Sequence, residues 1–148
     1  MNSIRKVFEE KENVNIGYIV AGYPSLDFTK EFLVRLSETN LDLLEIGIPY
    51  SDPLADGKLI SEASFTASQA GVTTDTVFDL LFSVKEKCSK PLIFLVYYNL
   101  IFAYGIDKFI EKSAQVGIKG IIIPDLPYEE SKEISEKLKA YHIAFIPL

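Results

Sequence analysis

The sequence predicts an α/β fold built around a parallel β-sheet. Short apolar segments with strand character alternate strictly with segments whose apolar residues recur at helical spacing. The strand segments are apolar almost throughout, which is typical of strands that are covered on both faces of a parallel sheet. Because no linker, repeat or low-complexity tract interrupts this alternation, we expect the 148 residues to form a single domain.

The beginning of the chain is expected to form a helix, a strand and a second helix. Residues 3–12 carry apolar side chains at helical spacing among charged ones, which predicts a short amphipathic helix. Residues 16–21 form an apolar run that stops at Gly-Tyr-Pro, which predicts a buried strand. Residues 28–38 return to helical spacing, and either Ser25 or Asp27 is expected to cap that helix.

The middle of the chain continues the alternation with one strand and two helices. Residues 41–49 are rich in Leu and Ile and end at a proline, as a buried strand would. Residues 59–70 are expected to be helical and to end at Gly71. Residues 75–87 form another expected helix, with lysines near its carboxyl end.

The last third supplies three more strands and two helices. Residues 92–98 are predicted to form a strand, and residues 105–116 a helix that a glycine ends. Residues 120–124 form the next expected strand, followed by a helix at 128–141 with acids in its first turn and lysines later. Residues 143–148 begin a fifth strand. The pattern alone leaves two layouts open, a doubly wound sheet and part of an eight-stranded barrel.

The composition and the motifs that are missing exclude several classes of protein. Hydrophobic residues make up 48% of the chain and charged residues 24%, which is a globular balance. The net charge of −6 disfavours a nucleic acid or an anionic membrane as partner. No G-x-G-x-x-G follows the first strand, which disfavours a dinucleotide site. Cys88 is the only cysteine, which fits a reducing compartment and a cytoplasmic location.

The most informative stretch is residues 43–57, with the sequence L-L-E-I-G-I-P-Y-S-D-P-L-A-D-G. Since strand side chains alternate between faces, Leu44 and Ile46 are expected to face helices and Glu45 the opposite side. A carboxyl group in an apolar interior tends to take up a proton or to find a partner, and a raised pKa suits general acid–base catalysis near neutral pH. The residues therefore indicate proton transfer centred on Glu45.

Two further acids, Asp52 and Asp56, lie in the loop that follows this strand. Each acid also has an ordinary explanation, which the residues alone leave open. Glu45 could be an interior carboxylate satisfied by local hydrogen bonds, whereas Asp52 precedes a proline and Asp56 a glycine, as common turn residues do.

Three stretches resemble the tryptophan synthase α subunit family. Residues 43–57 resemble its run E-(L/I)-G-x-P-x-S-D-P-x-A-D-G, which is long and specific. Residues 97–102, Y-Y-N-L-I-F, resemble its Y-x-N-x-(I/V)-x segment, and residues 123–131 resemble its D-(L/V)-P-x-E-E-(S/A) motif. Together the likeness extends from about Val14 to the end of the chain.

The resemblance implies a TIM (β/α)8 barrel rather than a doubly wound sheet. Such a barrel commonly takes about 250 residues, whereas this sequence ends within its fifth predicted strand. We therefore expect an incomplete barrel, the N-terminal part of an α subunit, with a helix in residues 1–13 and four βα units plus strand 5 in residues 14–148. An open arc exposes two sheet edges and an apolar inner face, so marginal stability, aggregation or pairing with another copy is expected.

The resemblance also implies roles for individual residues. Glu45 is implied to be the principal acid–base catalyst and Asp56 a second catalytic carboxylate at the indole nitrogen. The implied substrate-binding residues are Tyr18, Leu95, Tyr97, Ile122 and Pro124. Their alternative role is core packing, although Leu95, Tyr97 and Asn99 are expected to share one strand face. The residues implied to couple this chain to a partner subunit are Asp52, Pro53, Asn99 and Asp125.

The activity implied by the resemblance is retro-aldol cleavage of indole-3-glycerol phosphate to indole and glyceraldehyde 3-phosphate, in tryptophan biosynthesis. No metal or organic cofactor is expected in this subunit, whereas the β subunit of the expected α2β2 complex would carry pyridoxal phosphate. Barrels of this type commonly hold phosphate with the loops after strands 7 and 8. Those loops lie outside this sequence, so we expect these residues alone to bind substrate weakly and to turn over little.

Two other functions remain open. A different phosphosugar barrel enzyme, such as an isomerase of the same pathway, would usually carry a catalytic lysine in a strand, and none of the predicted strands contains one. A non-catalytic fragment or interaction module could instead keep the motif, bind a β-type partner and lack the phosphate site. His142 is expected to be a solvent-facing turn residue without a role.

Overall fold

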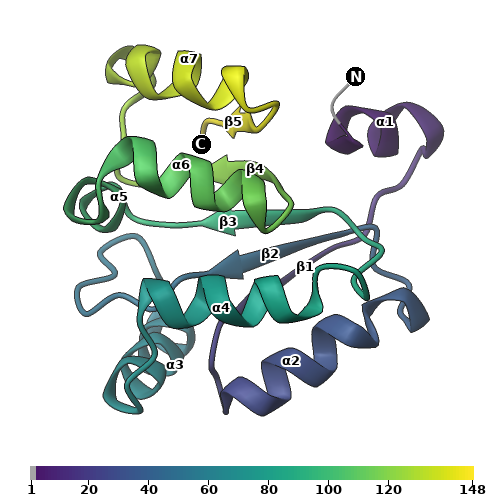
Figure 1. The fold of residues 1–148 in the computed structure, drawn as a ribbon, viewed down its shortest axis with the longest axis vertical. Coiled ribbons are helices and arrows are strands. Elements are labelled where there is room, and N and C mark those ends of the chain that lie inside the picture. Colours follow the sequence, from purple (N-terminus) through teal and green to yellow (C-terminus); the bar gives the residue numbers. More distant parts are fainter. Residues whose placement is uncertain (1–2) are drawn as a thin grey trace.

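Five parallel strands form one sheet in the order β1-β2-β3-β4-β5 in the computed structural model, which describes residues 3–148 (Figure 1). The strands are β1 Ile16–Val20, β2 Leu43–Gly47, β3 Leu92–Leu95, β4 Ile118–Ile122 and β5 Ala144–Ile146. Each strand pairs with the next one along the chain, which confirms the predicted α/β fold with a parallel sheet. The first two residues of the predicted N-terminal segment 1–13 lie outside the described residues.

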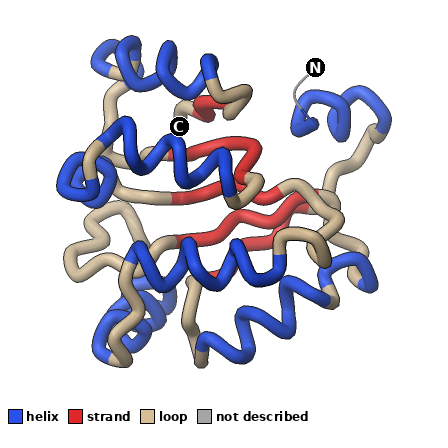
Figure 2. Tube along the Cα trace, in the orientation of Figure 1, coloured by secondary structure: helices blue, strands red, loops and turns tan. Residues whose placement is uncertain are grey.

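Helices α2 to α7 lie between consecutive strands along the chain, whereas α1 precedes β1, and Figure 2 shows the helices arranged around the strands. The helices are α1 Ser3–Glu10, α2 Leu26–Val34, α3 Lys58–Gln69, α4 Thr74–Val84, α5 Tyr98–Tyr104, α6 Ile106–Gln115 and α7 Lys132–Ala140. Along the sheet, α2 packs beside α4, α4 beside α6, and α6 beside α7. A doubly wound sheet would reverse its strand order and carry helices on both faces, so this sequential arc is part of a barrel. None of the helices in the described residues has the length and apolarity that crossing a membrane requires.

The two faces of the sheet belong to two different hydrophobic clusters. Leu44, Ile46 and Ile48 are buried in the large cluster that the sheet forms with the surrounding helices, as predicted. The opposite, inner face holds a small cluster around Leu43 and Ile93, against which residues of α1 pack. This division positions the candidate site, because every second residue of β2 must point to the inner face.

Helix α1 covers the amino end of the inner face. Its Ile4 lies so close to β4 that a Cβ atom placed on Gly120 would be 2.7 Å from the Ile4 Cδ1 atom. In Figure 1, α1 lies on the right, whereas the arrowhead of β2, the loop that follows it and α5 lie on the left. The carboxyl ends of the strands are therefore the end that α1 leaves uncovered.

Most predicted boundaries lie within a few residues of the observed ones. Ser25 caps α2, since its Oγ accepts a hydrogen bond from the Phe28 N–H at 3.1 Å. Gly71 follows α3 with a φ of 85°, a conformation that glycine adopts readily. His142 is exposed in the turn before β5, as expected.

The prediction of a strand over residues 92–98 is wrong at its carboxyl end. The strand ends at Leu95, and residues 98–104 form helix α5, which the aromatic and β-branched character of the segment had hidden. The tertiary structure favours the helix, because the Asp125 carboxylate accepts a hydrogen bond from the Tyr98 N–H at 2.8 Å, in the first turn. A distant residue therefore caps α5, a signal that local sequence does not contain.

The prediction that no strand contains a lysine is also wrong, because β4 begins two residues earlier than expected and includes Lys119. Lys119 is exposed and lies at a register irregularity between β3 and β4. It lines a cavity of about 300 Å³ with Pro91, Leu92 and Val116, at the amino end of the sheet. Catalytic residues of barrels lie at the carboxyl end, so Lys119 does not occupy the position of a catalytic lysine.

One buried acid ties α1 to the sheet. Asp42, just before β2, pairs with the Lys11 ammonium group and accepts a hydrogen bond from the Asn15 N–H at 2.9 Å. The hydrogen bond from Lys11, then that from Asn15, holds the pKa of Asp42 below its ordinary value of 3.8. A lowered pKa in the folded state means that the carboxylate stabilises the fold above its ordinary pKa and that this stabilisation is lost as the pH falls through the lower, folded-state value.

We predict that Asp42→Asn lowers the melting temperature at neutral pH and that the difference from the unsubstituted protein shrinks in strong acid, where Asp42 itself becomes protonated. Thermal unfolding followed by circular dichroism across this pH range measures the effect. Asp79→Asn is the control, since Asp79 is exposed on α4 and makes no hydrogen bond or ion pair with any described residue. A difference that stays constant with pH would contradict the role given to the Asp42 charge.

Candidate active site at the carboxyl ends of the strands

Glu45 projects from the middle of β2 onto the inner face of the sheet. Its register partners are Tyr18 on β1 and Ile93 on β3, so the carboxyl group has a phenol on one side and an aliphatic chain on the other. Burial raises the pKa of Glu45 above its ordinary value of 4.5. Among residues 3–148 no hydrogen bond or ion pair engages this carboxyl group, so no internal contact offsets the effect of burial on its ionisation. The predicted inward orientation of Glu45 is therefore confirmed.

Asp56 lies in the loop between β2 and α3, and its carboxylate is bonded to Tyr97, which follows the next strand, β3. The Tyr97 hydroxyl donates a hydrogen bond to the Asp56 Oδ2 atom at 3.1 Å and accepts one from the Ala55 N–H at 2.9 Å. Burial raises the pKa of Asp56, and the hydrogen bond from Tyr97 opposes this increase. One phenol thus binds two consecutive residues of the loop and fixes the position of the acid.

Tyr97 follows β3 and is almost completely buried, with 3% of its surface exposed. Burial is the main cause that raises the pKa of its phenol to about 12, so the group is protonated and donates at neutral pH. Its ring packs against that of Tyr50 with 5.0 Å between ring centroids. The structure thus places Tyr97 beside the loop as well as beside the inner face, a contact that the sequence did not predict.

The start of the same loop is held by α3 and α5. The Ser64 hydroxyl accepts a hydrogen bond from the Tyr50 N–H at 2.8 Å and donates one to the Tyr50 carbonyl at 3.0 Å. Asn99 donates to the Tyr50 hydroxyl at 3.2 Å. The expectation that Asn99 shares a strand face with Leu95 is wrong, because Asn99 lies in α5. Sequence reasoning missed Ser64, whose one signal was a polar residue beside the alanines that α3 buries.

The remaining predicted residues divide between the inner face and the loops. Leu95 and Ile122 are register partners on the inner face, so both lie on the same side of the sheet as Glu45. Pro124 follows β4, just outside the strand. Asp52 is exposed in the loop after β2, and its side chain has no partner among the described residues. Asp125 caps α5 from the loop after β4.

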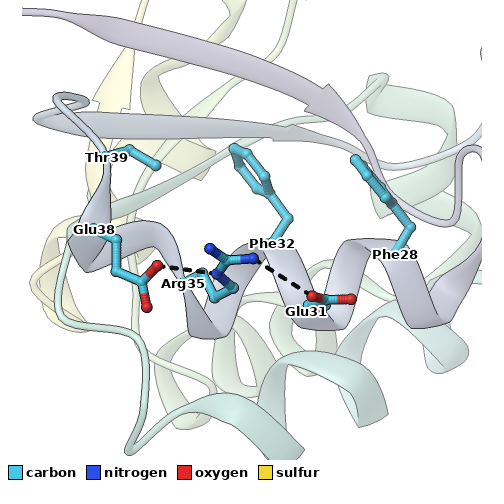
Figure 3. A pocket seen from close by; sticks show the side chains of 6 residues that line it. All are labelled: Phe28, Glu31, Phe32, Arg35, Glu38 and Thr39. Atoms are coloured by element: carbon cyan, nitrogen blue, oxygen red, sulfur yellow. Dashed lines mark hydrogen bonds and ion pairs between the residues drawn. The ribbon is translucent and has the colours of Figure 1, made fainter.

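The cavity drawn in Figure 3 lies elsewhere. It has a volume of about 320 Å³ and is lined by Phe28, Phe32 and Arg35 of the α2 segment and by neighbouring residues of the same stretch. Its polar side is occupied by ion pairs, with Arg35 3.7 Å from Glu31 and 3.0 Å from Glu38. None of the predicted site residues lines it. In the described part of the chain, no three His, Cys, Asp or Glu side chains are grouped to hold a metal ion.

Gly47, the last residue of β2, is in contact with the Tyr18 ring. A Cβ atom placed on Gly47 would lie 2.1 Å from the Tyr18 hydroxyl oxygen and 2.9 Å from the Cζ atom. The hydroxyl end of the ring therefore lies against the backbone of Gly47, one inner-face position beyond Glu45 towards the open end. Space for the phenol requires glycine at position 47.

Three comparisons agree on the relatives of this chain. The model of the tryptophan synthase alpha chain family matches residues 4–148. The curated tryptophan synthase alpha chain of Campylobacter jejuni subsp. doylei is 45% identical over 148 residues, which are 100% of this chain and 58% of that protein. The chain therefore spans less than two thirds of the length of this relative.

The solved structures point to the same family. Tryptophan synthase subunit alpha from Campylobacter jejuni superposes with a TM-score of 0.87 at 44% identity, over 96% of this chain and 56% of that one. Tryptophan synthase subunit alpha from Legionella pneumophila gives a TM-score of 0.92 at 31% identity, over 98% of this chain and 57% of that one. The predicted incomplete TIM barrel is thereby confirmed.

We predict that Gly47→Ala destabilises the fold by about 1–3 kcal/mol, because the new methyl group displaces the Tyr18 ring. Denaturant unfolding measures this loss. Gly57→Ala is the matched control, since no atom lies within 4 Å of a Cβ at that position and its cost is limited to a weaker helix cap. The loss should be smaller when Tyr18 is already alanine. Equal losses with and without the Tyr18 ring would contradict the proposed contact.

Proposed function

The chain belongs to the tryptophan synthase alpha chain family, and we propose that residues 3–148 supply the acid–base groups for retro-aldol cleavage of indole-3-glycerol phosphate to indole and glyceraldehyde 3-phosphate. The proposal rests chiefly on Glu45, an inward carboxyl group whose pKa is raised by burial and which no described residue engages. Leu95 and Ile122 add an apolar surface on the same face, suited to an indole ring.

In the proposed mechanism, Glu45 manages the protons at carbon and at the side-chain hydroxyl. Protonation of the indole at C3 weakens its bond to the glycerol chain, and removal of the proton from the adjacent hydroxyl allows that bond to break. The electron pair of the bond returns to the ring, the hydroxyl carbon becomes the aldehyde, and the proton count is unchanged. A carboxyl group whose pKa is raised by burial suits both transfers, since it holds a proton more readily than an exposed carboxyl group does.

Asp56 is proposed to interact with the indole N–H as charge develops on the ring nitrogen. Its carboxylate is held by Tyr97 and lies in a partly buried loop, where an electrostatic interaction is stronger than in water. No metal ion or organic cofactor is needed for these proton transfers. The phosphate is proposed to be held by parts of the barrel beyond these residues, so substrate binding by the 148 residues alone should be weak.

The partner proposed from the family is a β subunit that carries pyridoxal phosphate, in an α2β2 complex. The loop after β2 suits such a contact, because Leu54 in it is 85% exposed and the nearby Leu59 is 82% exposed. Asp52 and Pro53 belong to this loop, and Asn99 is bonded to the Tyr50 side chain at its start. The same exposed residues favour the alternative function, a non-catalytic module that binds a β-type partner.

We predict that Glu45→Gln lowers kcat by about 10²–10⁴-fold, because glutamine preserves the shape but transfers no proton. The assay measures cleavage of indole-3-glycerol phosphate by the whole protein that the gene encodes, with and without added β subunit. Glu136→Gln is the control, since Glu136 is exposed on α7. Full activity of Glu45→Gln would contradict the proposed catalysis. Binding of the β subunit without any cleavage by the unsubstituted protein would favour the interaction module.

We predict that Tyr97→Phe frees the loop after β2, since Ala55 and Asp56 lose their common partner. Backbone hydrogen exchange at residues 51–57 should become faster, and the pKa of Asp56 should rise because the hydrogen bond that lowered it is gone. Tyr98→Phe is the neighbouring control, as the Tyr98 hydroxyl has no partner among the described residues. Unchanged exchange in Tyr97→Phe would show that other contacts hold the loop.

A further inference from the structure

Tyr18 places a hydroxyl group on the inner face of the sheet, near both candidate catalytic acids. Its position is set by β1, where it is the register partner of Glu45, and by Gly47, over whose backbone the phenol lies. The negative charges of Asp56 and Glu45 both act on the phenol and, together with burial as the main cause, raise its pKa well above the ordinary value. The hydroxyl is therefore a neutral donor at any pH at which the protein would work.

No hydrogen bond within residues 3–148 uses this donor. The contrast with Tyr97 is informative, because the Tyr97 hydroxyl both donates to Asp56 and accepts from Ala55. Tyr18 thus differs from the other phenol of the site in having its O–H group available on the inner face. A partly buried O–H group without a partner costs free energy, and a ligand atom that accepts its hydrogen bond recovers that cost.

The site groups can be matched to the proposed substrate by hydrogen-bond type. The carboxylates of Glu45 and Asp56 accept hydrogen bonds, and they suit the O–H and N–H groups of the substrate. The indole ring offers no acceptor in its plane, so the oxygen atoms of the chain hydroxyls are the atoms near Glu45 to which a phenol can donate. An aliphatic or phenylalanine side chain at position 18 would leave those oxygen atoms without this donor.

We propose that Tyr18 is a specificity-determining residue, whose hydroxyl donates a hydrogen bond to a side-chain hydroxyl oxygen of the bound substrate and so favours hydroxylated chains over deoxygenated ones. This inference rests on the function proposed above. It assigns to Tyr18 a polar role beyond lining an apolar pocket, and it leaves proton transfer to Glu45.

Binding of two probes tests the proposal. Indole-3-glycerol phosphate carries the chain hydroxyls, whereas indole-3-propanol phosphate keeps the ring, the chain length and the phosphate but lacks them. Both probes are titrated by calorimetry into the whole protein that the gene encodes. The protein carries Glu45→Gln, which prevents turnover. Adding Tyr18→Phe should raise the Kd of the hydroxylated probe about three- to tenfold, the value of one neutral hydrogen bond, and leave the Kd of the deoxy probe within about twofold.

Tyr141→Phe makes the same chemical change at an exposed position before β5 and should alter neither Kd. Equal weakening of both probes by Tyr18→Phe would mean that the phenol acts by packing alone, which overturns the inference but not the proposed function. Unchanged binding of both probes would overturn it as well. If Glu45→Gln with Tyr18 intact binds neither probe, and the protein with Glu45 intact does not cleave the glycerol phosphate, the proposed function fails and this inference with it.

Discussion

On β2, Leu44 and Ile46 pack against the helices, which obliges Glu45 between them to project onto the other face of the sheet. A shift of one residue in the register would exchange the two faces, burying the charge among the helices and exposing the leucine and isoleucine. The apolar packing of the outer face therefore determines the direction of the candidate catalytic acid. The same alternation brings Leu95 and Ile122 to the inner face beside it.

Around this strand, the structure positions the loop after β2 through groups from three other elements. Tyr97 binds Ala55 and Asp56, Ser64 of α3 binds the backbone of Tyr50, and Asp125 caps the helix that begins just after Tyr97. These contacts connect three loops at the carboxyl end of the sheet. A displacement of α5 would move Tyr97, and through it the second acid, so the loop and the helix are expected to move together.

At the amino end of the sheet, a helix covers the inner face. Helix α1 packs on the inner face there, and the Asp42–Lys11 pair together with the Asn15 N–H holds it to the sheet. Apolar contacts with Ile4 and Ile146 leave no space there even for a Cβ atom on Gly120. Packing thus closes one end of the inner face, which leaves polar chemistry to the opposite end, as is general in barrels of this kind.

Sequence by itself determined the alternation of strands and helices, the parallel sheet and the inward direction of Glu45, because apolar periodicity and strand parity are local properties of the chain. It also singled out Asp56 through the motif that contains it. Tertiary structure alone decided that residues 98–104 are a helix, that Lys119 belongs to β4, that Tyr97 and Ser64 hold the loop, and that the Tyr18 hydroxyl lies over Gly47. Each of these depends on a partner far away in the chain, such as Asp125 for Tyr98. The local sequence does not specify which distant group will supply a hydrogen bond or occupy a space.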